Sequence, residues 1–206
     1  MKETHDYQHD IASIREVMER SSKFLSLSGL SGVMAGVYAL AGAVVAYHLL
    51  YYPQAPLGSP PVTATQAVIL RLLTLASAVL VLSIGTAIAM SYRKAKRAGS
   101  SIWNKTSRQL LALLGMPLVT GGLLILTFII NKYFALIAPA CLVFYGLALV
   151  NASSITVKEI GYLGFSQLLL GLVAALLPGY GLIFWGVGFG VLHIIYGAVM
   201  HYRYDL

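Results

Sequence analysis

Charged residues are scarce in this sequence of 206 residues. Asp, Glu, Lys and Arg together make up 10% of the chain, whereas hydrophobic residues make up 58%. Soluble domains carry roughly 25% charged residues. A chain this poor in polar side chains cannot cover a surface that faces water on all sides, so we expect most of it to lie in a lipid bilayer.

The residues that most enzyme and cofactor sites need are also missing. The single cysteine, Cys141, excludes an intramolecular disulfide and a cysteine-based zinc cluster. No aspartate lies within an apolar segment, and the histidines of the apolar segments fall at different depths, which excludes a metal cluster and bis-histidine haem ligation there. The glycines of 186–190 (GVGFG) lie inside an apolar run and follow no strand, so they are not a dinucleotide-binding loop. We therefore expect no catalytic residue, metal or cofactor, and no enzymatic activity.

Six long apolar segments make up most of the chain. A helix needs about 20 apolar residues to cross the roughly 30 Å of hydrocarbon in a bilayer, and each segment is close to that length. The segments are continuously apolar and do not alternate as the strands of a membrane barrel would. The sequence therefore predicts an all-α membrane domain over residues 24–206, with spans near 24–50, 66–91, 109–130, 133–151, 160–177 and 182–201.

The loop charges predict the orientation. Segment 93–108 holds six Lys and Arg residues, whereas segment 52–66 holds none. The positive-inside rule places the first in the cytoplasm and the second outside, with Lys132 as the exception among the outer loops. Six spans then form three hairpins with both termini in the cytoplasm. The positive charge follows the span ends, so it predicts no nucleic-acid partner.

The polar N-terminal segment 1–23 has one narrow apolar face. Ile11, Ile14 and Met18 share a helical face beside charged residues, which indicates a short cytoplasmic helix lying on the membrane surface. A solvated extension is the alternative, because the face is narrow.

Small residues form stripes on three of the predicted spans. On the last span, Gly186, Gly190 and Gly197 share one face with His193, and small residues let neighbouring helices approach closely. We therefore expect His193 to point at another helix or into a cavity, and not at lipid. A similar stripe on the fifth span, Gly164 and Gly171, flanks Gln167, and we expect this face to meet the last span. The stripe of Gly29, Gly32 and Gly36 on the first span packs either inside the bundle or against a second subunit.

The turn at 178–181 (PGYG) sets the register of the last two spans. In a hairpin folded there, Gln167 lies at the depth of His193, and Glu159 lies near His201 or Arg203 at the cytoplasmic boundary. We expect Gln167 and His193 to be in direct or one-water contact, because polar groups in hydrocarbon need partners. The contact either fixes the hairpin register or belongs to a transport path in which His193 titrates.

A weak internal similarity links two spans. Segments 144–153 (FYGLALVNAS) and 195–204 (IYGAVMHYRY) both carry a Tyr-Gly pair followed by apolar residues and a polar exit. This pattern hints at a repeated unit and adds Tyr196 to the candidate polar residues of the last span.

The two ends of the chain resemble an uncharacterised family of six-span bacterial membrane proteins. Segments 19–43 (ERSSKFLSLSGLSGVMAGVYALAGA) and 178–205 (PGYGLIFWGVGFGVLHIIYGAVMHYRYD) carry the resemblance. It implies a multi-pass protein of the bacterial inner membrane and no particular activity.

Two functions remain open from the sequence. The first is a small-solute or proton-linked transporter or channel with a polar site at the middle of spans five and six. The second is a non-catalytic scaffold or accessory subunit that binds a partner protein through its N-terminal helix and the basic loop 93–108. Its glycine faces would then contact a second copy, in a homo-oligomer, or a partner membrane protein. A cavity that reaches His193 favours the first, and glycine faces filled by neighbouring helices favour the second.

Overall fold

The computed structural model describes residues 28–51, 65–97, 103 and 105–205. This part of the chain is helical and contains no strand. Its elements are α2 (Gly29–Leu50), α3 (Gln66–Arg97), α4 (Lys105–Ile130), the 3₁₀ turn η1 (Phe134–Leu136), α5 (Ile137–Ser153), α6 (Lys158–Leu176), α7 (Gly181–Trp185), the π-helix η2 (Gly186–Leu192) and α8 (His193–Tyr204).

Within the described residues, six helices are long and apolar enough to cross a membrane. They are α2, α3, α4, α5 with its preceding 3₁₀ turn, α6, and one continuous helix made of α7, η2 and α8, which we call the last span. The predicted all-α class is thus confirmed, and the number of membrane-length helices matches the number of predicted spans. The predicted interfacial helix within 1–23 lies outside the described residues.

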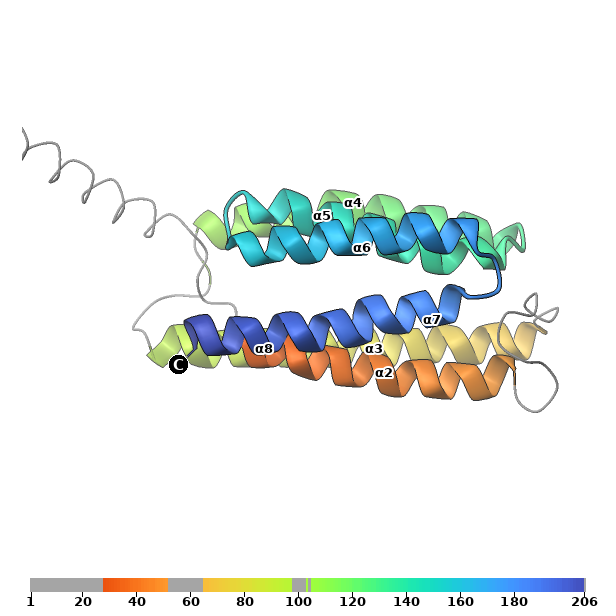
Figure 1. Cartoon of the computed structure of the whole chain (residues 1–206), viewed down its shortest axis with the longest axis horizontal. Helices are drawn as coiled ribbons and strands as arrows, with labels where there is room; N and C mark the ends of the chain where they lie inside the picture. Colours follow the sequence, from red (N-terminus) through yellow and green to blue (C-terminus); the bar gives the residue numbers. More distant parts are fainter. Residues whose placement is uncertain (1–27, 52–64, 98–102, 104, 206) are drawn as a thin grey trace, which may run out of the picture.

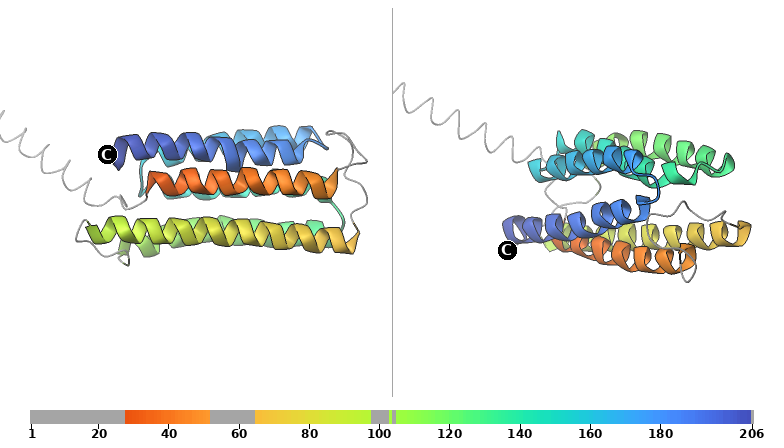
Figure 2. Two further views of the ribbon diagram at one scale, coloured as in Figure 1. Left: turned by 90° about the horizontal axis from the view of Figure 1, so that it is seen from below. Right: turned by 45° about the vertical axis from the view of Figure 1, so that its right-hand side comes forward.

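The six spans form two layers. Figure 1 shows α4, α5 and α6 in one layer, and α2, α3 and the last span in the other. Figure 2 shows α2 lying between α3 and the last span. The last span packs mainly against α2, whereas α6 packs mainly against α5 and contacts the last span much less.

The glycines of α2 bring its backbone against that of the last span. A Cβ atom added to Gly36 would lie 2.6 Å from the carbonyl oxygen of Gly190, and one added to Gly32 would lie 3.1 Å from the Cα atom of Gly197. A Cβ added to Gly29 would collide with the backbone nitrogen of His201. The two glycine stripes therefore meet each other within one chain.

The glycines of α6 contact α5. A Cβ atom on Gly164 would lie 2.9 Å from the carbonyl oxygen of Gly146, and one on Gly171 would lie 2.7 Å from Val143. Our expectation that this face of the fifth span meets the last span is therefore wrong. A stripe of small residues fits any helix that can approach closely, so it does not specify which neighbour will do so.

Helices α3 and α4 bury few residues. The buried residues of α3 are Ser91 and Ala95, and those of α4 are Ser107, Leu110 and Gly121. These two helices therefore present most of their apolar side chains to the outside of the bundle, as expected for lipid-facing helices.

Both described ends of the chain lie at the same end of the bundle. The backbone N–H of Gly29 donates to the carboxylate of Asp205 over 2.8 Å. This is the arrangement expected of an even number of spans. Which end faces the cytoplasm remains a prediction from the loop charges.

Candidate functional site

The middle of the last span is a π-helix. Its seven residues, Gly186–Leu192, include the buried glycines Gly186, Gly188 and Gly190. In a π-helix the backbone hydrogen bonds connect residues five apart, and such segments are frequent at functional sites because they change which backbone groups are free. The carbonyl oxygen of Gly188, within this segment, accepts hydrogen bonds from side chains.

Three side chains gather around that carbonyl group. Gln167 donates from Nε2 to the Gly188 oxygen over 2.9 Å, and Nδ1 of His193 lies 2.9 Å from the same oxygen. The hydroxyl group of Tyr145 lies 2.9 Å from Nε2 of His193. We call Tyr145, Gln167, Gly188 and His193 the polar centre. It joins α5, α6 and the last span, and therefore links the two layers.

The polar centre is shielded from the surroundings of the bundle. Gln167 is 0% exposed and His193 is 6% exposed. Aromatic rings cover one side, because Phe189 stacks on His193 at a centroid distance of 5.8 Å and Trp185 lies 5.2 Å beyond Phe189. A polar group at such a site must find its partners within the protein.

The geometry fixes one proton of the His193 ring. A carbonyl oxygen can only accept, so Nδ1 of His193 must carry the hydrogen that it donates to Gly188. Nε2 is then free to accept from the Tyr145 hydroxyl in the neutral ring. In the protonated ring, Nε2 donates to the same hydroxyl oxygen. The ring can therefore gain or lose a proton without losing either contact.

One polar atom of the centre has no partner among the described residues. Oε1 of Gln167 is buried and accepts no hydrogen bond. A Cβ atom on Gly188 would lie 2.5 Å from this oxygen, so the glycine leaves room for the amide beside the π-helix. The Gln167 amide thus donates one hydrogen bond through Nε2, while its acceptor Oε1 has no partner among the described residues.

No match to the chain was found among protein-family models, curated proteins or solved structures.

The structure brings Gln167 and His193 to the same depth, as the hairpin register predicts, but joins them indirectly. Both hydrogen-bond to the Gly188 carbonyl oxygen, and no direct hydrogen bond connects the two described side chains. In place of the expected direct contact, the Gly188 carbonyl oxygen bridges the two side chains. A contact through one water stays a prediction.

The other predicted polar residues lie apart from this centre. At the end of the bundle that holds Asp205, Glu159 pairs with Arg203 and accepts from the Tyr204 hydroxyl over 3.1 Å. His201 lies 3.2 Å from Asp205 and does not pair with Glu159. Tyr196 packs beside a buried apolar cluster that includes Ile160, Leu163 and Met200.

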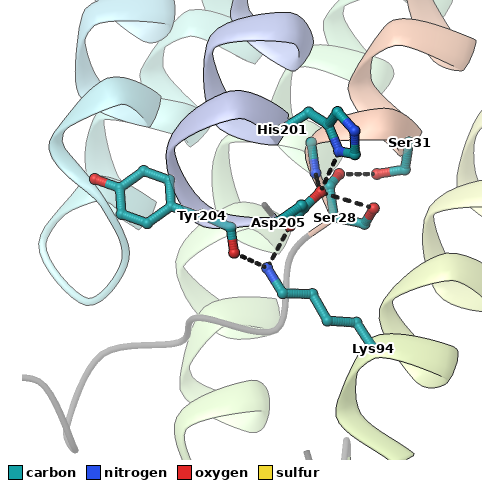
Figure 3. A network of polar contacts seen from close by, with 7 residues as sticks. Ser28, Ser31, Lys94, His201, Tyr204 and Asp205 are labelled. Atoms are coloured by element: carbon teal, nitrogen blue, oxygen red, sulfur yellow. Dashed lines mark hydrogen bonds and ion pairs between the residues drawn. The ribbon is translucent and has the colours of Figure 1, made fainter. Parts of the chain in front are cut away.

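A second polar cluster surrounds Asp205 (Figure 3). Its carboxylate accepts from Lys94 Nζ over 2.6 Å, from the Gly29 N–H over 2.8 Å and from the Ser28 hydroxyl over 3.3 Å, and it contacts His201. We call these five residues the terminal cluster. Burial by itself would raise the pKa of Asp205, but the hydrogen bonds from Lys94, His201 and Gly29 and the charge of Lys94 hold that pKa below its usual value.

Sequence reasoning missed Tyr145 and Asp205. The Tyr-Gly pair of segment 144–153 was the available signal for Tyr145, because it repeats the pair that begins at Tyr196. Asp205 follows the last apolar residues and meets the start of α2, which no local pattern indicates.

We expect Gly188→Ala to disturb the polar centre. The new methyl group would meet Oε1 of Gln167 and the side chain of Leu142, both fully buried. Overpacking of this kind costs about 1–3 kcal/mol. Thermal unfolding in detergent micelles should show the loss.

Gly186→Ala is the matched control from the same π-helix. Its methyl group would lie 3.5 Å from Ala43, an ordinary contact. An equal loss of stability in the two variants would contradict the packing described for Gly188.

Proposed function

We propose that this protein is a small-solute or proton-linked transporter or channel of the membrane, with the polar centre as its site. The observation that carries the proposal is the buried amide of Gln167, whose acceptor oxygen has no partner among the described residues. An unpaired acceptor within hydrocarbon is costly, and a passing donor such as a hydrated proton or a small protonated solute would pair with it.

The His193 ring supports the proton-linked form of this proposal. It keeps contacts at both nitrogen atoms whether it is neutral or charged, because Gly188 always accepts and the Tyr145 hydroxyl can donate or accept. Histidine changes its charge between about pH 5 and 8 when its surroundings do not perturb it. Such a group can take up a proton and pass it on without a rearrangement of the helices.

The π-helix and the glycines around it are a second support. Close packing of α2 on the last span uses backbone contacts, which few side chains would obstruct during a small sliding movement. Wide helical turns and interrupted helices are the means by which transporters expose backbone groups at a binding site.

His193→Gln should abolish the pH dependence of proton movement. The protein would be reconstituted in vesicles containing a pH-sensitive dye, and a potassium diffusion potential would drive proton entry. In the wild-type protein we expect entry to rise several-fold as the outer pH is lowered, because a lower pH protonates a larger fraction of the His193 rings. In the variant the rate should stay low and flat.

Two controls accompany this measurement. His48→Gln alters a histidine of α2 that makes an edge-to-face contact with Tyr47 and takes no part in the polar centre, so it should keep the wild-type profile. Far-ultraviolet circular dichroism would show that His193→Gln remains helical. Wild-type vesicles no leakier than empty ones at any pH, or an unchanged profile in His193→Gln, would overturn the proton-linked proposal.

An accessory subunit is the second candidate, and two observations favour it. Neighbouring helices fill the glycine faces of α2, α6 and the last span, and the cavity of the described residues does not reach His193, which are the outcomes expected of an accessory subunit. A different set of glycines faces outward. Added Cβ atoms on Gly85, Gly115 and Gly122 would meet nothing within 4 Å. These glycines lie on α3 and α4, which bury the smallest share of their residues among the six membrane-length helices of the described chain. Small residues on an outward face permit close approach of a helix from a second copy or a partner membrane protein.

A further inference from the structure

An apolar cavity of about 330 Å³ lies between the two layers, away from the polar centre. Its walls come from α2, α3, α4, α5 and α7, at the end of the bundle opposite the terminal cluster. Aliphatic and aromatic side chains form nearly all of the lining. The hydroxyl group of Tyr51 is one of the few polar groups there, and it donates a hydrogen bond to the carbonyl oxygen of Gly179 over 3.3 Å. Apolar cavities of this kind stay dry and accept hydrocarbon.

The cavity is about one leaflet deep. On α3 its lining extends from Ile69, near the start of the helix, to Val79, and this separation corresponds to about 15 Å at 1.5 Å per residue. On α2 it extends from Leu50, the last residue of the helix, back to Gly42. Half of the roughly 30 Å hydrocarbon core is about 15 Å. The cavity therefore matches the depth reached by one acyl chain from the membrane surface.

The bilayer has a route into this cavity between α3 and α4. Helix α3 packs on α2 and helix α4 packs on α5, whereas α3 and α4 make few contacts with each other. Leu73 of α3 lines the cavity and is also 41% exposed on the outside of the bundle. An acyl chain of the surrounding lipid can thus enter the cavity laterally, without passing through water.

A lysine lies near the end of the cavity. Lys132 is exposed and lies in the turn between two lining residues, Ile129 and Phe134. Its backbone has a positive φ of 62°, which reverses the chain at the end of α4. Tyr133 beside it is 58% exposed, as is usual for aromatic side chains at the membrane–water interface. An ammonium group in this position would attract the phosphate of a lipid headgroup.

We propose that the cavity binds one acyl chain of a membrane phospholipid, with the lipid phosphate near Lys132. The ligand class follows from the apolar lining, the depth of one leaflet, the lateral access and the charge at the mouth. The polar centre takes no part, because the cavity lining includes none of Tyr145, Gln167 and His193. A failure of the transport proposal would therefore leave the lipid site unaffected, and a failure of the lipid site would leave the transport proposal unaffected.

Trp185 provides a direct probe of the occupant. It lines the cavity, and the only other tryptophan in the sequence, Trp103, can be removed by Trp103→Phe. The protein would be reconstituted in phosphatidylglycerol whose chains carry bromine at mid-depth, because bromine quenches tryptophan fluorescence on contact. We expect strong quenching of Trp185 by the lipid and little quenching by acrylamide in the water.

Filling the cavity should remove this quenching. Ala76→Phe places a ring in the cavity from α3 and should at least halve the quenching by brominated lipid. Ala78→Phe is the control, since residue 78 is exposed on the same helix and does not line the cavity. Ala135→Phe fills the cavity from the opposite layer and serves if Ala76→Phe does not fold.

Three results would overturn the lipid site. The first is weak quenching of Trp185 by brominated lipid in the parent protein. The second is strong quenching by acrylamide, which would mean that water fills the cavity. The third is unchanged lipid quenching in a folded variant whose cavity is filled.

Lys132→Gln tests the headgroup contact. The parent protein should prefer brominated phosphatidylglycerol to brominated phosphatidylcholine by at least twofold, and this preference should vanish in the variant. Equal preference in the parent would remove Lys132 from the proposal.

Discussion

Gly36→Leu should separate α2 from the last span and cause a large loss of stability. A Cβ atom at this position would lie 2.6 Å from the carbonyl oxygen of Gly190 and 2.9 Å from the backbone nitrogen of Ile194. Backbone atoms of a packed helix cannot move aside as a flexible side chain can. We expect a cost of about 3 kcal/mol or more, at or above the upper end of ordinary overpacking.

Titration of the folded protein with sodium dodecyl sulfate in mixed micelles would measure this loss as a lower midpoint. Gly85→Leu is the matched control, because the glycine lies within α3 and an added Cβ would meet nothing within 4 Å. That variant should unfold at or slightly above the wild-type midpoint, since leucine favours helix more than glycine does. Equal midpoints for the two variants would refute the close packing of α2 on the last span.

Asp205→Ala should cause the second large loss, because it removes the acceptor shared by the terminal cluster. The carboxylate is 10% exposed and holds the start of α2, the end of α3 and the end of α8 together. Hydrogen bonds to charged groups contribute about 1.5–3 kcal/mol each, and the released Lys94 regains water, so we expect a net cost of about 2 kcal/mol. The same detergent titration would measure it.

The pKa of Asp205 predicts how this contribution depends on pH. Its folded pKa is lowered, so the stabilisation is fully present above the unfolded value of about 3.9 and is lost as the pH falls through the folded value. Asp205→Asn should therefore lack the acid-induced loss that the wild-type protein shows below about pH 4.

Glu159→Gln is the control for this acid transition. The Glu159 side chain is 12% exposed, but its partner Arg203 is 65% exposed, so solvent screens the pair, and such exposed ion pairs contribute about 0–1 kcal/mol. We expect this variant to lose little stability and to keep the acid transition. If Asp205→Asn kept the transition and Glu159→Gln lost it, the role assigned to the terminal cluster would be wrong.

The membrane class and the six spans were predictable because they depend on the lengths of apolar runs. Those runs end at polar residues and prolines, so the predicted boundaries differ from the helices of the structure by a few residues at most positions. Helix α3 extends further, to Arg97, because its last turns are basic and leave the apolar run while remaining helical. The common depth of Gln167 and His193 was also predictable, since the turn at 178–181 fixes the register of two rising helices.

The connection between those two side chains was not predictable from side-chain spacing. It depends on the Gly188 carbonyl, which lies within a π-helix, and neither a backbone acceptor nor a π-helix changes the residue types in a way that periodicity could detect. The partner of Gly164 was missed for a related reason. Small residues indicate that another helix approaches closely. That this helix is α5 depends on how all six spans pack. The terminal cluster joins residues from both ends of the chain, which local patterns cannot connect.

The pairing of the first and last spans has a consequence for synthesis of the protein. Gly29 and Asp205 are 176 residues apart, and at about 5–20 residues per second a ribosome needs roughly 10 to 35 s to add the residues between them. During that time α2 is in the membrane while the surface that will cover its glycines does not yet exist. The close contact between α2 and the last span can therefore form only after synthesis of the chain is nearly complete. A chain that is truncated before the last span would leave α2 without this neighbour.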